Sequence, residues 1–382
     1  MIYFDHNATA PVMREARDAW LDATEKFSGN PSSPHQVGSR ANVAMREARE
    51  KLAHFLGCHA NDIVWTSGAT EANNTVMHHF AKTLDTKSEV WVSAIEHPCI
   101  DESSKHYFGK RAKFIPVTHD GVIDLDWLTS ELADTRPGLV AVMAANNETG
   151  VIQPWREIFS ICQSYEVPFF TDAVQWLGKM PAKDLGQCDF VTGAAHKFGG
   201  PRGIGFLKIP HKSKITPLLV GGKQEQGIRA GTENVATILS MLAALEIREK
   251  QIARGEHKLR EVWRGNFEKQ VLKELPGAKI VGANSPRLWN TVSALMPHGS
   301  QLHWVTKLDK AGFAVSTGSA CTTGKEEPSH VLAAMHFKAA EAHRVLRFSS
   351  GWETTESDWD ALADALKKIH EEIHPVKARS TA

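Results

Sequence analysis

The stretch DFVTGAAHKFGGPRGIGF, Asp189–Phe206, carries a lysine at the point where an apolar run gives way to a glycine-rich turn. The run ends in small residues, and a second apolar run follows the glycines. This pattern predicts two strands joined by a loop, with Lys197 flanked by residues too small to block its amine. A His-Lys pair in such a loop is, taken by itself, most often an exposed surface pair. The rest of the chain therefore decides whether Lys197 is functional.

Short apolar runs alternate with helical patterns on both sides of this stretch. Strand, loop and helix in alternation predict an α/β fold with a mainly parallel sheet covered by helices. The predicted strands are Asp62–Thr66, Val90–Ser93, Leu139–Ala144, Pro168–Thr171, Phe190–Thr192 and Ile204–Ile209. The predicted helices are Arg14–Lys26, Ser39–Leu56, Ile158–Tyr165 and a helix that runs from Ser67–Thr70 towards Thr83.

The pattern changes after Asn234, where a long helical stretch reaches Leu275. It is followed by strands predicted at Lys279–Val281, Thr291–Met296 and Val345–Phe348, and by helices predicted at Thr306–Ala311, Ser329–Met335 and Glu356–His374. This composition predicts a smaller α+β domain. We expect residues 14–250 to form the large domain, and residues 1–13 with 251–382 to form the small one.

Composition narrows the class of protein. Hydrophobic residues make up 42% and charged residues 23%, which is ordinary for a globular chain of 382 residues. The 44 basic and 44 acidic residues cancel, which argues against a broad nucleic-acid-binding face. No apolar run approaches the roughly 20 residues of a membrane span, and the N-terminus does not resemble a secretory signal. The five scattered cysteines, without a CxxC pair, indicate a reducing compartment, so we predict a cytoplasmic protein.

Polar residues follow the predicted strands repeatedly, at the point where each strand ends. They are Ser67–Thr70, His97, Asn147, Asp172 with Gln175, and His196 with Lys197. Each has an ordinary explanation alone, as a helix cap, a turn residue or a loop residue. In an open α/β sheet, however, ligands bind beyond the carboxyl ends of the strands. The repetition therefore predicts a ligand site at this edge.

The combination has a chemical logic. Small residues at a helix N-terminus, Ser67–Thr70, provide N–H groups and hydroxyls for a phosphate. The Asp172 carboxylate suits a protonated ring nitrogen, and the His97 ring can stack on a planar cofactor. The Lys197 amine can form a Schiff base in a dry site. Together these are the requirements of pyridoxal phosphate.

Ten motifs in one order then point to a family. They are DHNATAPV (Asp5–Val12), GNPSSPHQVG (Gly29–Gly38), TSGATEANN (Thr66–Asn74), EHPC (Glu96–Cys99), NNETGVIQP (Asn146–Pro154), TDAVQWLGK (Thr171–Lys179), AHKFGGPRGIGF (Ala195–Phe206), RAGTEN (Arg229–Asn234), STGSACTTGKEEPSHVL (Ser316–Leu332) and RFSSGWETTESD (Arg347–Asp358). With them the chain resembles the cysteine desulfurases of the NifS/IscS type, class V, fold-type I pyridoxal-phosphate enzymes. The resemblance implies a mainly parallel seven-stranded sheet in the large domain, and a homodimer.

The resemblance also implies roles for cofactor-binding residues. Lys197 would hold pyridoxal 5'-phosphate through its amine, and His97 would stack on the ring and move protons. Asp172 would bind the ring nitrogen and Gln175 the phenolic oxygen. The remaining cofactor contacts would come from Thr70, His196 and Asn147, and from Thr232 of the partner subunit.

The substrate implied by the resemblance is L-cysteine. Asn147 and Arg347 would hold its carboxylate, and Asn7 and Asn290 would be further substrate-pocket residues. Cys321 would be the nucleophile that takes the sulfur as a persulfide, leaving L-alanine. An acceptor protein, of iron–sulfur cluster assembly or of thiolation, would then take the sulfur. We expect Cys58, Cys99, Cys162 and Cys188 to be structural thiols.

Two positions depart from the family pattern. Ala194 stands where the family often has Ser or Thr, so one phosphate contact is missing, and His6 replaces an Asn of the first motif. Selenocysteine lyase, another class V enzyme and a non-catalytic scaffold remain alternatives. The glycine run does not open a helix, which argues against a nicotinamide site. His370–His374 reads HExxH, but Pro375 follows and no third ligand lies downstream, so we expect no metal site.

Overall fold

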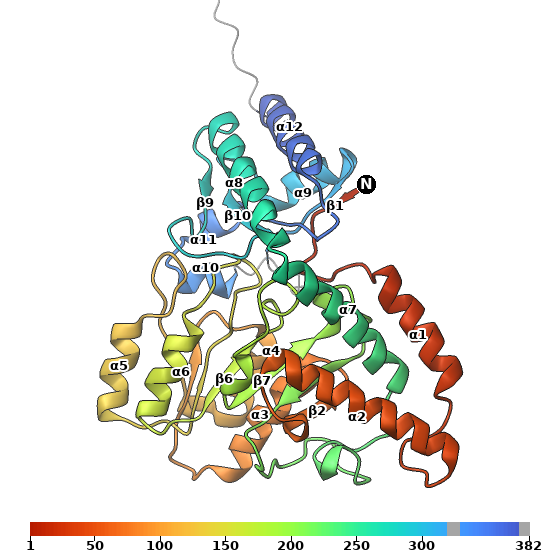
Figure 1. Cartoon of the computed structure of the whole chain (residues 1–382). Helices are drawn as coiled ribbons and strands as arrows, with labels where there is room; N and C mark the ends of the chain where they lie inside the picture. The colour runs from red at the N-terminus through yellow and green to blue at the C-terminus, as the bar shows by residue number, and fades with distance from the viewer. Residues whose placement is uncertain (319–328, 374–382) are drawn as a thin grey trace, which may run out of the picture.

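The computed structural model describes residues 1–318 and 329–373 and contains a seven-stranded sheet (Figure 1). The strand order is β2-β8-β7-β6-β5-β3-β4. Every neighbouring pair is parallel except those of β8, which runs antiparallel to β2 and β7. The strands are β2 (Ile63–Thr66), β3 (Val90–Ser93), β4 (Ala112–Ile115), β5 (Leu139–Ala141), β6 (Phe169–Asp172), β7 (Phe190–Ala194) and β8 (Gly205–Lys208). The predicted mainly parallel sheet is therefore confirmed.

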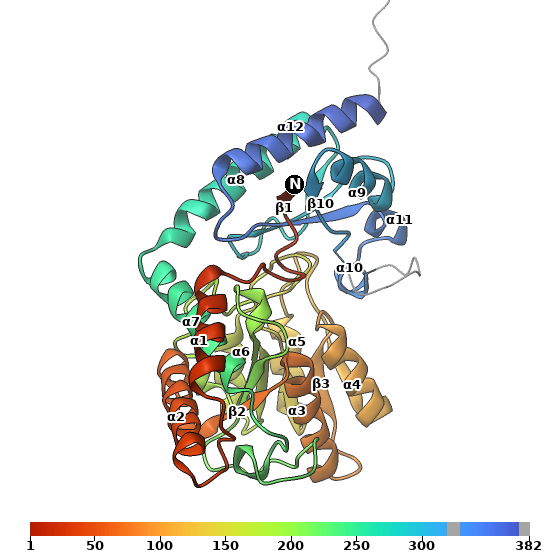
Figure 2. The same cartoon turned by 90° about the vertical axis from the view of Figure 1, so that its right-hand side faces the viewer.

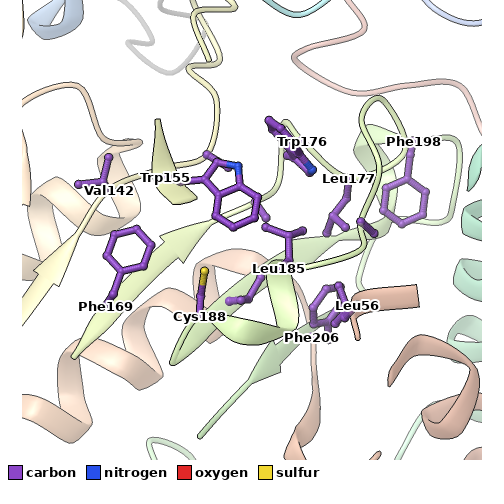
Figure 3. Close-up of a cluster of buried hydrophobic side chains, with 14 of the residues drawn as sticks. Leu56, Val142, Trp155, Phe169, Trp176, Leu177, Leu185, Cys188, Phe198 and Phe206 are labelled. Atoms are coloured by element: carbon purple, nitrogen blue, oxygen red, sulfur yellow. The ribbon is translucent and has the colours of Figure 1, made fainter. Parts of the chain in front are cut away.

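Helices cover both faces of this sheet, because its central strands are buried on both sides. One face packs against α1 (Arg14–Lys26), α2 (Gln36–Leu56), α5 (Leu125–Asp134), α6 (Trp155–Ser164) and α7 (Val235–Ala253). Figure 3 shows part of this core, which includes Trp155, Phe169 and Phe206. The other face packs against α3 (Ala69–Thr83) and α4 (Pro98–Phe108).

A second lobe lies beyond one edge of this body (Figure 2). Its antiparallel sheet contains β9 (Lys279–Ile280), β10 (Thr291–Leu295) and β12 (Val345–Ser349). Its separate hydrophobic core includes residues of α8 (Glu256–Glu274), α9 (Gln301–Lys310) and α12 (Glu356–Ile373). The short helices α10 (His330–Ala334) and α11 (Ala339–Ala342) bury Val331, Leu332 and Ala342 against the core of the large body. The domain bounds given above stay a prediction.

The N-terminus joins this second lobe. The strand β1 (Ile2–Tyr3) pairs in parallel with β11 (Phe313–Ala314), and Phe4 lies in the lobe's core. Neither strand was predicted, because two-residue strands carry no periodicity. The chain then crosses to the large body through residues 5–13. Among the described residues, no helix is long and apolar enough to cross a bilayer.

Two further regions differ from the sequence prediction. The helical stretch from Asn234 to Leu275 is two helices, because Gly255 takes a φ of 74° and separates α7 from α8. Residues 98–134 contain α4, β4 and α5, which were not predicted. β4 is an edge strand with only Ile115 fully buried, so it lacks the apolar run that marks the central strands.

Candidate active site

A cavity of about 940 Å³ lies at the carboxyl ends of the parallel strands, between the two lobes. His97 follows β3, Asn147 follows β5, Asp172 ends β6, and His196 follows β7. The second lobe contributes Arg347 from β12. The predicted site residues that line the cavity are Asn7, Thr70, His97, Asn147, Asp172, Gln175, His196, Lys197 and Arg347. The structure thus brings together residues separated by up to 340 positions in the chain.

Lys197 is positioned by the turn between β7 and β8. It ends a single 3-10 turn, Ala195–Lys197, and its Nζ donates to the carbonyls of Asn7 and Ala8, both at 2.7 Å. The glycines make this turn possible. A Cβ on Gly205 would lie 2.6 Å from the carbonyl oxygen of Gly193 and 2.8 Å from the backbone of Gly68. Only glycine therefore allows β8 to approach the loop that precedes α3.

His97 is held through its own helix start. It is the N-cap of α4, and its Nδ1 accepts the backbone N–H of Cys99 at 3.2 Å. The Cys99 Sγ lies 3.0 Å from the same nitrogen. An Nδ1 that accepts places the proton of the neutral ring on Nε2. Burial lowers the pKa of His97, with Lys197 and His330 acting in the same direction and Asp172 opposing them, which favours that neutral ring.

Asp172 belongs to the same network. One carboxylate oxygen accepts the backbone N–H of Val174 at 2.9 Å, and the other accepts from Asn73 Nδ2 at 2.9 Å. Asn73 also donates to the Cys99 sulfur at 3.0 Å. Cys99 also lines the cavity, and it links His97 to Asp172 through Asn73. From the sequence we expected only a structural thiol at this position. Burial raises the pKa of its thiol to about 12, so the sulfur stays protonated.

The N-terminus of α3 faces the cavity through Ser67, Gly68, Ala69 and Thr70. The first N–H groups of a helix have no partner within it, so they are available to an anion. Glu71 in the first turn is engaged elsewhere. It forms an ion pair with Arg229 at 2.8 Å, which anchors the RAGTEN segment to this helix and lowers the pKa of Glu71.

Arg347 is only 2% exposed and pairs with Asp5 at 2.7 Å. Its Nη1 donates to the carbonyls of Asn147 at 3.0 Å and Gly318 at 3.1 Å. Its Nε has no acceptor within residues 1–318 and 329–373. Asp5 was not predicted as a site residue, because nothing in the first motif indicates that it pairs with Arg347, 342 positions away.

Asn7 lies at the centre of the site and is 1% exposed. Its backbone carbonyl accepts from Lys197 and from Gln175 Nε2. Its side chain donates to Thr291 Oγ1 at 2.9 Å and to the Asn147 carbonyl at 3.1 Å. Asn290, fully buried, donates to Asn7 Oδ1 at 3.0 Å and does not line the cavity, so it supports Asn7 from behind.

The remaining predicted residues have different positions. Thr232 is exposed and is not among the residues that line the cavity of its own chain. Cys321 lies outside the residues that the structure describes. His196 places its Nδ1 3.2 Å from Thr9 Oγ1, and burial together with Lys197 and Arg202 lowers its pKa to about 4. Ala194 lines the cavity with no hydroxyl to offer.

The HExxH motif ends outside the described range, at His374. His370 on α12 has its Nδ1 2.8 Å from Nε2 of His298. Within residues 1–318 and 329–373, no group of three or more His, Cys, Asp or Glu side chains is arranged to hold a metal. The expectation that the chain binds no metal stays a prediction.

The residues around the cavity suit pyridoxal phosphate. A buried carboxylate, an imidazole, a lysine amine and a helix N-terminus converge on one space. The cavity size is within the range of small-molecule sites, about 300–1,000 Å³. The guanidinium of Arg347, which lines the cavity, adds a cation for an anionic substrate group. No departure in the sequence removes any of these groups, although Ala194 leaves the phosphate end with one hydroxyl fewer.

Comparison with known proteins gives a consistent picture. The family model of aminotransferase class V matches residues 2–362. Cysteine desulfurase IscS of Dictyoglomus turgidum is 37% identical over 382 residues, covering 98% of this chain and 96% of that protein. The structure of a NifS-like protein from Rickettsia africae has a TM-score of 0.86 at 33% identity, over 98% of this chain and 100% of the other. SspA, solved in complex with cysteine, has a TM-score of 0.80 at 27% identity, over 93% and 100%.

Proposed function

Because the chain belongs to the class-V aminotransferase family, and within it to the cysteine desulfurases, we propose that it removes the sulfur of L-cysteine and releases L-alanine. The observation that carries this proposal is the convergence of Lys197, Asp172, His97 and Arg347 on one cavity. A lysine amine, a carboxylate, a ring and a guanidinium are the groups that pyridoxal-phosphate chemistry on an amino acid requires.

Enzymes of this family depend on pyridoxal phosphate, and we propose which residues hold it here. Lys197 would bond to it through Nζ, Asp172 would bind the ring nitrogen, and Gln175 the phenolic oxygen. The phosphate would lie at the N-terminus of α3, with contacts from Thr70 and His196. When bound, the cofactor supplies an electron sink for the α-carbon of an amino acid.

Arg347 is proposed to orient the substrate. The carboxylate of L-cysteine would accept from the guanidinium of Arg347, which lines the cavity. Asn147 would bind the same carboxylate, with Asn7 and Asn290 holding the surrounding backbone. Asp5 keeps the guanidinium plane fixed at 2.7 Å. A charge-assisted hydrogen bond in this dry position is stronger than one in water.

Lys197 and His97 are proposed to move protons. The neutral Nζ of Lys197 would take the proton from the α-carbon, and neutral His97 would donate the proton on its Nε2. The lowered pKa of His97 favours its neutral ring. Because Nδ1 accepts the backbone N–H of Cys99, this ring carries its proton on Nε2, so His97 is first a proton donor and becomes an acceptor only after that proton has left.

Cys321 is proposed to accept the sulfur. Its thiolate would attack the substrate sulfur as the sulfur–carbon bond breaks, and the electron pair would stay with the carbon fragment. Protonation of that fragment gives L-alanine. Overall, L-cysteine and the Cys321 thiol give L-alanine and a Cys321 persulfide, so no external oxidant or reductant is needed. An acceptor protein of iron–sulfur cluster assembly or thiolation would then take the sulfur, in the cytoplasm.

The purified protein with added pyridoxal phosphate and L-cysteine tests this function. We expect a visible absorption band of bound cofactor, with alanine and sulfide released in the presence of a reducing thiol. Lys197→Ala should lose the band and the activity together. Cys321→Ala should keep the band and lose more than about 100-fold in alanine release. Undiminished alanine release by Cys321→Ala would instead favour another class V reaction.

A further inference from the structure

Lys179 is a buried lysine at the back of the candidate active site. Its side chain is 3% exposed, and within residues 1–318 and 329–373 no carboxylate forms an ion pair with it. Burial and the charges of Lys197 and Arg347 hold its pKa well below the usual value. An ammonium or amine without a carboxylate is costly to bury, so its presence requires another reason.

The Lys179 amine contacts two amide oxygens. It donates to Gln175 Oε1 and, at 3.2 Å, to Asn7 Oδ1. The end of each carboxamide that faces Lys179 is its oxygen, because the NH₂ end of each donates to a backbone carbonyl. Gln175 Nε2 donates to the Asn7 carbonyl at 3.0 Å, and Asn7 Nδ2 donates to the Asn147 carbonyl at 3.1 Å. Lys179 is the only donor recorded for Gln175 Oε1 among the described residues.

The backbone around Lys179 is fixed as well. Its carbonyl accepts from Trp289 Nε1 at 3.0 Å, and the carbonyl of Gly178 accepts from Trp352 Nε1 at 2.8 Å. Gly178 takes a φ of 69°, and a Cβ there would lie 2.3 Å from Cβ of Phe198. Two tryptophans of the second lobe therefore hold the turn that directs Lys179 into the site.

We propose that Lys179 is a positioning residue, which orients the Gln175 carboxamide so that its NH₂ group is presented at the cavity. This inference rests on the proposed use of pyridoxal phosphate. With Gln175 Oε1 tied to Lys179, the amide offers a donor, not an acceptor, to an anionic oxygen of the bound ring. Without Lys179, Oε1 has no donor and only the bond from Nε2 to the Asn7 carbonyl holds the amide, so rotation, which would place an oxygen against that anion, costs less.

The test is the pH titration of the visible absorption band of the cofactor in the holoenzyme. The titratable and charged groups that interact electrostatically with Lys179 are His6, His196, Lys197 and Arg347. None of them is substituted in the variants used here. Lys179→Met removes the donor and the charge, and we expect the titration midpoint to rise by about one pH unit, a tenfold change in protonation. Lys179→Gln, which can donate or accept, should give an intermediate midpoint.

A double-mutant cycle separates positioning from a general loss of structure. In a Gln175→Met background, Lys179→Met should add less than about 0.3 pH unit, because there is no amide left to orient. Lys208→Met is the matched control. Lys208 is 4% exposed and donates to the Cys188 carbonyl, outside the cavity, so its loss should leave the midpoint unchanged. If Lys179→Met does not fold, the same comparison is made with Lys179→Gln in the parent and in the Gln175→Met background.

The affinity of the apo-protein for pyridoxal phosphate is a readout independent of turnover. We expect Lys179→Met to raise the dissociation constant at least threefold at pH 8, and Lys208→Met to leave it unchanged. An unchanged midpoint in Lys179→Met, or an equal shift in the Gln175→Met background, would overturn the inference while leaving the proposed function intact. Failure of the parent protein to bind pyridoxal phosphate would instead overturn the proposed function.

Discussion

His6 shows how one side chain can link the site to pH. It is 7% exposed, its Nδ1 donates to the Ser349 carbonyl at 3.2 Å, and its ring fills the space in front of Gly351. A Cβ on Gly351 would lie 2.2 Å from Nε2, so the glycine is what admits the ring. Burial lowers the pKa of His6 to about 4, with Lys179 and Arg248 adding to the effect.

His6→Asn restores the residue that the family often has, and it should change the pH dependence of stability. In the parent, the unfolded chain binds a proton below its pKa of 6.5 while folded His6 does not until about pH 4. Stability is therefore full above pH 6.5 and falls as the pH drops towards 4. Between pH 7 and 5 this group removes about 2 kcal/mol from the free energy of unfolding.

Urea denaturation at the two pH values measures the effect. We expect His6→Asn to show a drop smaller than the parent's by about that amount. His196, whose pKa is also lowered to about 4, contributes a drop of the same sign in both proteins and serves as the background. An equal drop in parent and variant would contradict the assignment to His6.

The elements that build the site meet through backbone, not side chains. The turn after β7 holds Lys197, the first turn of α3 holds Thr70, and β8 lies against β7 and the loop that precedes α3. Gly205 is at the contact between β8 and this loop. The distances there join backbone atoms, which cannot rotate away from an added methyl group.

Gly205→Ala should therefore displace the N-terminus of α3 from the cavity. We expect the free energy of unfolding to fall by about 1–3 kcal/mol and the affinity for pyridoxal phosphate to fall at least tenfold. Chemical denaturation and equilibrium dialysis measure the two quantities. Gly265→Ala on α8 is the control, because no atom lies within 4 Å of its added Cβ. That variant should gain about 0.5–1 kcal/mol, as alanine favours helices over glycine.

At the scale of the whole molecule, the site depends on the N-terminal segment, which joins the two lobes. Residues 5–13 run from the small lobe to the large body and bring Asp5 and Asn7 between Arg347 and Lys197. Thr232, by contrast, is exposed and away from the cavity of its own chain. We propose that it completes the site of the other subunit in a homodimer.

Subunit complementation tests that proposal. Lys197→Ala and Thr232→Asp should each be inactive as homodimers. In a mixed dimer, the Thr232→Asp subunit keeps its own lysine and receives a native Thr232 from its partner, so one site is complete. We expect alanine release of about half the parent's rate per dimer. If Thr232 acts within its own chain, both sites of the mixed dimer are damaged and the activity stays absent.

Much of the fold was predictable because local patterns carry it. The buried central strands are apolar runs, and β3 and α1 were predicted with the bounds that the structure has. α2 begins at Gln36, three residues earlier than predicted, because His35 caps it. Edge strand β4 and the two-residue strands β1 and β11 had no such signal. Their positions depend on pairing partners distant in sequence.

The sequence by itself determined the chemistry of the site. Lys197, His97 and Asp172 are recognisable from residue type and from their place after apolar runs, because strand ends in a parallel sheet meet at one edge. Only the tertiary structure decided what orients these groups. Asp5 against Arg347, Asn73 between Cys99 and Asp172, and Lys179 against Asn7 are contacts between segments that no local pattern relates. Hydrogen bonds of this kind depend on distances of a few ångströms, which folding sets and residue order does not.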